Sequence, residues 1–110
     1  MTLRTCTLAA ALLTALPSFA QISDGVVRLG VINDQSGPYA ALTGPGSALA
    51  VRMAVEDMKA QLGDTKVEVL VADHQNKPDV GLTIVKRWFD VDKVDAVLDI
   101  ANSAVALGVQ

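Results

Sequence analysis

The strongest constraint on this 110-residue chain is a regular alternation between short apolar runs and helical patterns. Val26–Ile32, Lys66–Ala72 and Val94–Ile100 are rich in β-branched residues, which predicts buried strands. Between them, Ser47–Leu62 and Asp79–Phe89 repeat apolar residues every three or four positions, which predicts helices. A third helix is expected to begin at residues 101–103. This order predicts an α/β fold, a parallel sheet with helices on both faces.

The predicted topology also indicates where a ligand would bind. Right-handed crossovers that cover both faces of the sheet place the strands in spatial order 2-1-3. Lys66 and Glu68 make the second run less apolar, which suits an edge strand. Ligands of open α/β sheets bind beyond the carboxyl ends of the strands, where the chain reverses direction. We therefore expect a site between two loops, Asn33–Thr43 and Ile100–Ala104.

Polar residues in these loops are candidates for binding an anion. Ser103 opens the third helix, and the free N–H groups near Ala104 and Val105 would favour a carboxylate. The Ser103 hydroxyl and the Asn102 amide can add donors. The alternative is that Asn102 or Ser103 only caps the helix. In the first loop, the Tyr39 ring can line a pocket or pack within the loop itself.

The loop that follows the second strand contains a candidate helix cap. Asn76 is expected to cap the second helix, with Pro78 in its first turn.

Asp34, Asp73 and Asp99 follow the three strands and together can hold Mg²⁺. The simpler interpretation is that these carboxylates accept hydrogen bonds from loop amides. We favour that interpretation and expect no metal site.

Other motifs depart from the patterns they approach. Gly44–Leu49 has leucine at the third glycine of a dinucleotide fingerprint and does not directly follow a strand. Asp90–Asp95 lacks the fifth-position oxygen ligand and the sixth-position glycine of a calcium loop. His74 is the only histidine, and no cysteine or second histidine is at hand for zinc. We expect no cofactor and no enzymatic activity.

Met1–Ala20 has the three-part layout of a secretory signal peptide. Arg4 precedes an apolar run, Leu8–Leu16, and small residues stand at positions 18 and 20. The apolar run is too short to span a bilayer, which takes roughly 20 residues. We expect cleavage after Ala20 and export to the periplasm, or to the outside of a single-membrane cell. The only cysteine, Cys6, would be removed with the signal.

The formal net charge of −3 argues against nucleic acid as a partner, because phosphates attract a basic face. It argues equally against docking on an anionic membrane surface. These exclusions leave small molecules and proteins as partners.

Four segments together resemble a known family. "SGPYAALTG" after the first strand, "AVEDM" in the first helix, "VADHQNKPD" after the second strand and "FDVDKVDAVLDIANSA" around the third occur in a specific order and spacing. The chain thereby resembles type I periplasmic substrate-binding proteins of ABC importers, the branched-chain amino acid receptor (leucine-binding protein) group. The resemblance covers essentially all of residues 21–110.

The resemblance implies a receptor of two α/β lobes that closes on its ligand, with residues 21–110 as the first part of the N-terminal lobe. Ser103 matches the serine that binds the ligand's carboxylate, and Asn102 matches the residue beside it. Leu42 matches a position of the pocket wall, with Tyr39 nearby. Ala104 stands where serine or threonine is frequent, which extends the expected ligands from amino acids to other organic, including aromatic, carboxylates.

The sequence therefore predicts a periplasmic solute receptor, monomeric at full length, that delivers a small carboxylate to a membrane permease. Two alternatives remain open. One is an extracytoplasmic sensing domain of a signalling protein, which a transmembrane or kinase segment further along the chain would favour. The other is an exported α/β hydrolase, although no triad pattern supports it.

Overall fold

A computed structural model describes residue 22 and residues 24–110 of the chain. The predicted signal peptide lies outside these residues. The strands are β1 (Val26–Asn33), β2 (Lys66–Asp73) and β3 (Ala96–Leu98). The helices are α1 (Ala40–Thr43), α2 (Pro45–Asp57), α3 (Lys59–Leu62), α4 (Pro78–Asp90) and α5 (Ser103–Val109).

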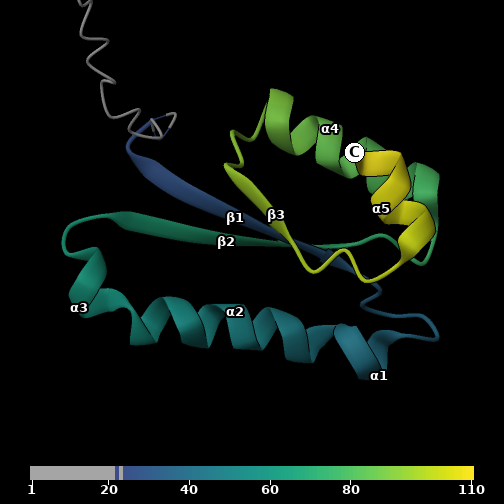
Figure 1. Ribbon diagram of the computed structural model, residues 1–110, viewed down its shortest axis with the longest axis horizontal. Helices are drawn as coiled ribbons and strands as arrows, with labels where there is room; N and C mark the ends of the chain where they lie inside the picture. Colours follow the sequence, from purple (N-terminus) through teal and green to yellow (C-terminus); the bar gives the residue numbers. More distant parts are fainter. Residues whose placement is uncertain (1–21, 23) are drawn as a thin grey trace, which may run out of the picture.

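The three strands form a parallel sheet in the order β2-β1-β3 (Figure 1). β1 pairs with β2 along its full length, from Val26 opposite Lys66 to Asn33 opposite Asp73. On its other side β1 pairs with β3, with Leu29 opposite Ala96. The predicted order 2-1-3 is confirmed, and β2 is an edge strand.

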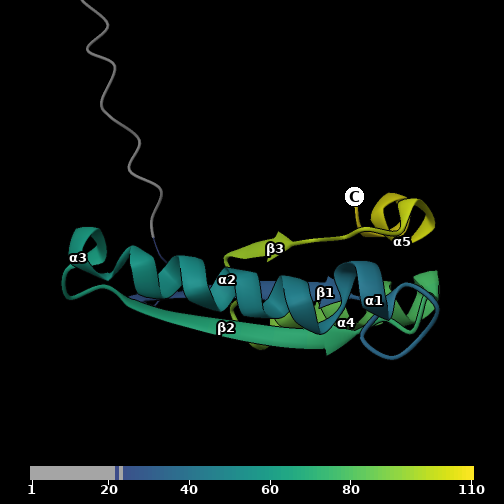
Figure 2. The ribbon, with the colours of Figure 1, turned by 90° about the horizontal axis from the view of Figure 1, so that it is seen from below.

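Helices cover both faces of the sheet, as predicted: α2 lies on one side and α4 with α5 on the other (Figure 1). In both views α2 runs alongside the strands (Figure 2). The side chains of successive residues in each strand point to opposite faces of the sheet. In β1, Gly30 and Ile32 face α4, whereas Val27 and Leu29 face α2.

The core lies between α4 and the sheet. Its buried members are Ile32, Val85, Trp88 and Val94. The Trp88 ring lies directly over Gly30, where a Cβ atom would come within 2.4 Å of the ring. A glycine in the central strand is therefore what lets α4 approach the sheet. On the opposite face, the predicted stripe of α2 and α3 is only partly buried, and Met58 is 48% exposed.

Two elements differ from their predicted limits by more than one residue. The helix expected over 47–62 begins at Pro45, whose missing N–H needs no partner in a first turn, and is interrupted at Met58. The strand expected over 94–100 is limited to Ala96–Leu98. Its start is set by Asp95, whose carboxylate accepts the Arg28 N–H at 2.8 Å. Its end is set by Asp99, which has a left-handed φ of 59°.

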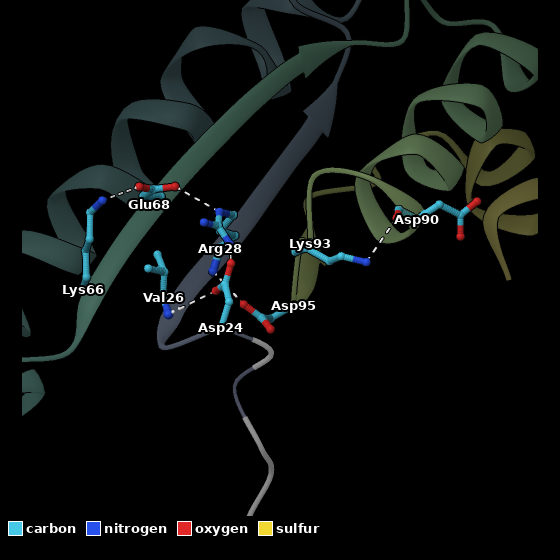
Figure 3. Close-up of polar contacts among 8 residues, drawn as sticks. All are labelled: Asp24, Val26, Arg28, Lys66, Glu68, Asp90, Lys93 and Asp95. Carbon is cyan, nitrogen blue, oxygen red and sulfur yellow. Dashed lines mark hydrogen bonds and ion pairs between the residues drawn. The ribbon is translucent and has the colours of Figure 1, made fainter.

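Charged residues connect the strands at their amino ends, opposite the predicted site (Figure 3). Arg28 on β1 contacts Asp24 at 2.6 Å and Glu68 on β2 at 3.0 Å, and Lys66 contacts Glu68 at 2.7 Å. The hydrogen bond with Asp24 raises the pKa of Arg28 further, and the one from Lys66 lowers the pKa of Glu68. This network orders the end of the sheet away from the site.

In the part of the chain that the structure describes, no helix has the length and apolar character that crossing a membrane requires.

Candidate functional site

A cavity of about 380 Å³ lies at the carboxyl end of the sheet. The two loops expected to form a site both contribute to it, and so does the loop after β2. Its lining residues are Asp34, Tyr39, Leu42, Thr43, His74, Ala101, Asn102, Ser103 and Ala104. All five residues predicted to contact a ligand therefore line the same cavity.

Ser103 is the first residue of α5 and is exposed in the cavity wall. Its hydroxyl makes no hydrogen bond to any other residue that the structure describes. Ala104 follows it and is also exposed. The hydroxyl can therefore donate to a molecule in the cavity without breaking a bond within the protein.

Asn102 is the N-cap of α5. Its Oδ1 accepts the N–H groups of Ala104 at 2.8 Å and of Val105 at 3.1 Å. The expectation that these two N–H groups are free for an anion is wrong, because the Asn102 side chain occupies them. The capping alternative holds for Asn102 and not for Ser103. Of the predicted donors at this terminus, the Ser103 hydroxyl and one proton of the Asn102 amide stay available.

Asn76 contributes to the same corner from the loop after β2. The prediction that it caps α4 is wrong, since the N-cap is Lys77 and no side chain caps that helix. Asn76 has a left-handed φ of 57°, and its Oδ1 instead accepts a hydrogen bond from the Asn102 Nδ2. Pro78 begins α4, as predicted. Asn76 thereby holds the amide of Asn102 in the orientation that caps α5.

Tyr39 and Leu42 extend from the loop after β1. Tyr39 is 49% exposed and Leu42 is 78% exposed, and both line the cavity. Of the two alternatives for the Tyr39 ring, the structure favours a place in the wall. These two side chains add an apolar part to the wall, which also contains the polar start of α5.

Two buried residues at the carboxyl end of β1 hold these loops in place. Asp34 accepts the N–H groups of Gly37 and Tyr39, each at 2.9 Å. The Asn33 Nδ2 donates to the Thr43 carbonyl and to the Asp99 carboxylate, so it connects the loop after β1 with the end of β3. Both lie in the first loop expected at the site, and Asp34 accepts loop amides as predicted, but the contacts of Asn33 were not predicted. The available signal was polar residues directly at the carboxyl end of a buried strand.

Asp34 and Asp73 accept hydrogen bonds from loop amides, as the simpler interpretation predicted, whereas Asp99 accepts the side-chain amide of Asn33. Asp73 accepts the N–H groups of Gln35 and Gln75 and the Ser36 hydroxyl. Burial by itself raises the pKa of Asp73, but these hydrogen bonds together hold it below its ordinary value of 3.8. Among the described residues, no group of three or more His, Cys, Asp or Glu residues is arranged to hold a metal ion.

The start of α5 is positioned by close packing against α4. A Cβ atom on Gly81 of α4 would lie 2.5 Å from the Cγ1 atom of Val105, which is fully buried. Glycine is unfavourable within a helix, but here only glycine leaves room for Val105. Through this contact α4 sets the position of Ser103, two residues earlier.

The family model for periplasmic binding proteins matches residues 26–110, nearly all of the described chain. The chain belongs to this family. Since its members are binding proteins, the expectation that the chain is not an enzyme is confirmed at the level of the family. No curated protein matches the chain.

Solved structures show the same fold. A branched-chain amino acid ABC transporter periplasmic ligand-binding protein from Burkholderia xenovorans LB400 is 46% identical, with a TM-score of 0.70. A periplasmic binding protein from Burkholderia mallei is 38% identical, with a TM-score of 0.72. Each covers 76% of this chain, which spans only 22% of theirs.

A leucine-binding protein from Thermotoga maritima is more distant, at 26% identity and a TM-score of 0.66. It covers 76% of this chain, which spans 23% of its length. The predicted family resemblance and fold class are thus confirmed.

Proposed function

We propose that residues 21–110 are the first part of the N-terminal lobe of a periplasmic receptor that serves an ABC importer. Family membership and the 46% identity to an ABC transporter ligand-binding protein support this role. The family supports a periplasmic location, and residues 1–20 are the signal peptide that directs export, cleaved after Ala20. At full length the receptor is a monomer that delivers its solute to a membrane permease.

The observation that carries the proposal is the cavity between the loops after β1 and β3, with the Ser103 hydroxyl free in its wall. The proposed solute is an amino acid or a small organic carboxylate, aromatic acids included. Ser103 donates to the carboxylate. Asn102 keeps one amide proton beyond the one it gives to Asn76, and can donate it to the same group.

The rest of the cavity suits the body of such a solute. Tyr39 and Leu42 provide apolar contact, and Ala104 adds little bulk beside Ser103. Asp34, with 1% of its surface exposed, adds a negative charge to the wall. A solute with an ammonium group is attracted to that charge, so a zwitterionic amino acid suits this wall better than a simple anion. Closure of a second lobe over Tyr39 and Leu42 would complete the site.

The proposal is tested on the full-length protein. Native mass spectrometry would show whether a small carboxylate accompanies the purified protein, and calorimetry with L-leucine and benzoate would measure the affinity for two representatives. We expect Ser103→Ala to weaken the binding of the better probe by about 1–3 kcal/mol, because a hydrogen bond to a charged group is lost.

Ser47→Ala is the matched control, because Ser47 lies in α2 and does not line the cavity. It should leave the affinity unchanged. If Ser103→Ala binds as tightly as the wild type with its fold intact, Ser103 does not contact the solute. If neither probe binds and no small carboxylate accompanies the protein, the proposed function is wrong.

A further inference from the structure

His74, the only histidine of the chain, directly follows β2 and lies in the wall of the cavity. Only 1% of its surface is exposed. Its backbone is fully engaged: the N–H donates to the Asn33 carbonyl at 3.0 Å, and the carbonyl accepts the Lys77 N–H at 2.8 Å. The backbone of His74 is therefore held between the end of β1 and the start of α4.

One ring nitrogen of His74 has a partner and the other has none. Nδ1 accepts the Asn76 N–H at 3.0 Å, so it carries no proton, and the proton of the neutral ring is on Nε2. Nε2 is a buried donor without a hydrogen-bond partner among the described residues. Buried donors are almost always paired in native proteins, and each exception calls for a physical reason.

We propose that His74 is a ligand-contacting residue whose Nε2–H donates a hydrogen bond to an oxygen of the bound carboxylate. This inference rests on the proposed function and extends it to the loop after β2. His74 and Ser103 lie in the wall of one cavity, so each can serve an oxygen of the same group. Nε2 is covered in this conformation, so a small side-chain adjustment accompanies binding.

The chemistry of this donor determines what it selects. A neutral N–H held away from water binds a carboxylate strongly, because a hydrogen bond to an ionised group is stronger than one between neutral groups. It offers nothing to an apolar or purely cationic solute. His74 would therefore make the site selective for solutes that present an acceptor oxygen at this wall.

Two substitutions in the full-length protein separate the two ring nitrogens. In His74→Asn, the side-chain oxygen lies near the place of Nδ1 and can accept the Asn76 N–H, but the Nε2 donor is lost. In His74→Gln, the amide nitrogen reaches the place of Nε2 and keeps a donor. Calorimetry uses L-leucine and benzoate, and thermal unfolding checks that each variant folds.

We expect His74→Asn to bind the better probe about tenfold or more weakly than the wild type, and His74→Gln to stay within about threefold. Wild-type affinity in His74→Asn, or an equal loss in both folded variants, overturns the inference and leaves the proposed function standing. If the wild type binds neither probe and no small carboxylate accompanies the purified protein, both the inference and the proposed function fail.

A measurement on the wild type keeps the inference testable if the variants do not fold. In a protein labelled with ¹⁵N histidine, the Nε2–H resonance of His74 should shift when the binding probe is added. The ¹⁵N shift of Nδ1 should stay that of an unprotonated nitrogen that accepts the Asn76 N–H. A ring spectrum that is unchanged at saturating probe overturns the inference.

Discussion

The side chain of Asn102 combines two tasks that place Ser103. Its oxygen accepts the N–H groups of Ala104 and Val105, and its nitrogen donates to Asn76. An amide can be rotated so that nitrogen and oxygen exchange places, which would end the capping. The Asn76 side-chain oxygen can pair only with the nitrogen of the Asn102 amide. It therefore favours the orientation in which the Asn102 oxygen caps α5. Asn76 is thus a positioning residue that acts on the site through Asn102.

We expect Asn76→Gly to weaken binding of the better probe about three- to tenfold, because Asn102 loses the partner that orients it. Glycine accepts the left-handed φ of 57° without strain, so the substitution tests the side chain alone. Gln75→Gly is the control: Gln75 has a φ of 51° and makes no hydrogen bond to Asn102. Calorimetry on both variants measures the difference.

Rescue distinguishes positioning from general support of the fold. Asn76→Asp keeps the acceptor oxygen and tolerates the left-handed backbone, so its affinity should stay near that of the wild type. Equal affinities for Asn76→Gly and Gln75→Gly would show that the contact with Asn102 does not position Ser103.

At the scale of elements, the contact between α4 and α5 matters most for the site. α5 has only seven residues and one fully buried side chain, Val105, which lies against Gly81. A helix this short is not stable by itself and takes its position from the element it packs on. The sequence pattern marks Gly81 only as a weak position in a helix, whereas the structure gives it a role in placing α5.

We expect Gly81→Ala to destabilise the protein by about 1–3 kcal/mol and to lower solute affinity. Alanine normally stabilises a helix interior by up to about 1 kcal/mol over glycine, but here its Cβ would overlap Val105. Gly108→Ala, in α5, meets no atom within 4 Å and should not destabilise the protein. Urea unfolding and calorimetry would check both variants; a stable Gly81→Ala variant with full affinity would contradict the argument.

At the scale of the whole molecule, carboxylates with lowered pKa values lie at both ends of the sheet. Asp24 and Glu68 lie at the amino end and Asp73 at the carboxyl end. Ionised carboxylates of this kind stabilise the fold above the pKa they have in the unfolded chain. That stabilisation is lost as the pH falls through their lower folded-state values. The fold should therefore lose stability below about pH 4.

Asp73→Asn tests how much the ionised carboxylate of Asp73 contributes to this stability. Compared with the wild type it should be less stable at pH 6–7, because the hydrogen bonds from Ser36, Gln35 and Gln75 no longer reach a charged acceptor. The difference should shrink as the pH falls below about 4 and through the lowered folded-state pKa of the wild-type carboxyl. Urea unfolding across this range measures it, and a difference that does not vary with pH would exclude the ionised form as the cause.

The sequence by itself determined the element order, the strand order and the two loops that meet at the cavity. These depend on local periodicity, which can be read within short windows of the chain, and on the right-handedness of crossovers, which is a general rule. Ser103 and Tyr39 were placed at the site by the same reasoning, whereas Leu42 was placed there only by the family resemblance.

Only the tertiary structure decided which donors remain free. Asn102 occupies N–H groups that were expected to be available. Asn76 bonds to the cap of α5 instead of capping α4. His74 lies in the cavity wall with an unpaired donor. The limits of β3 likewise depend on Arg28 and Asn33, more than 60 residues earlier. The physical reason is that hydrogen-bond partners distant in sequence compete for each polar group, and the outcome is set only when the loops come together.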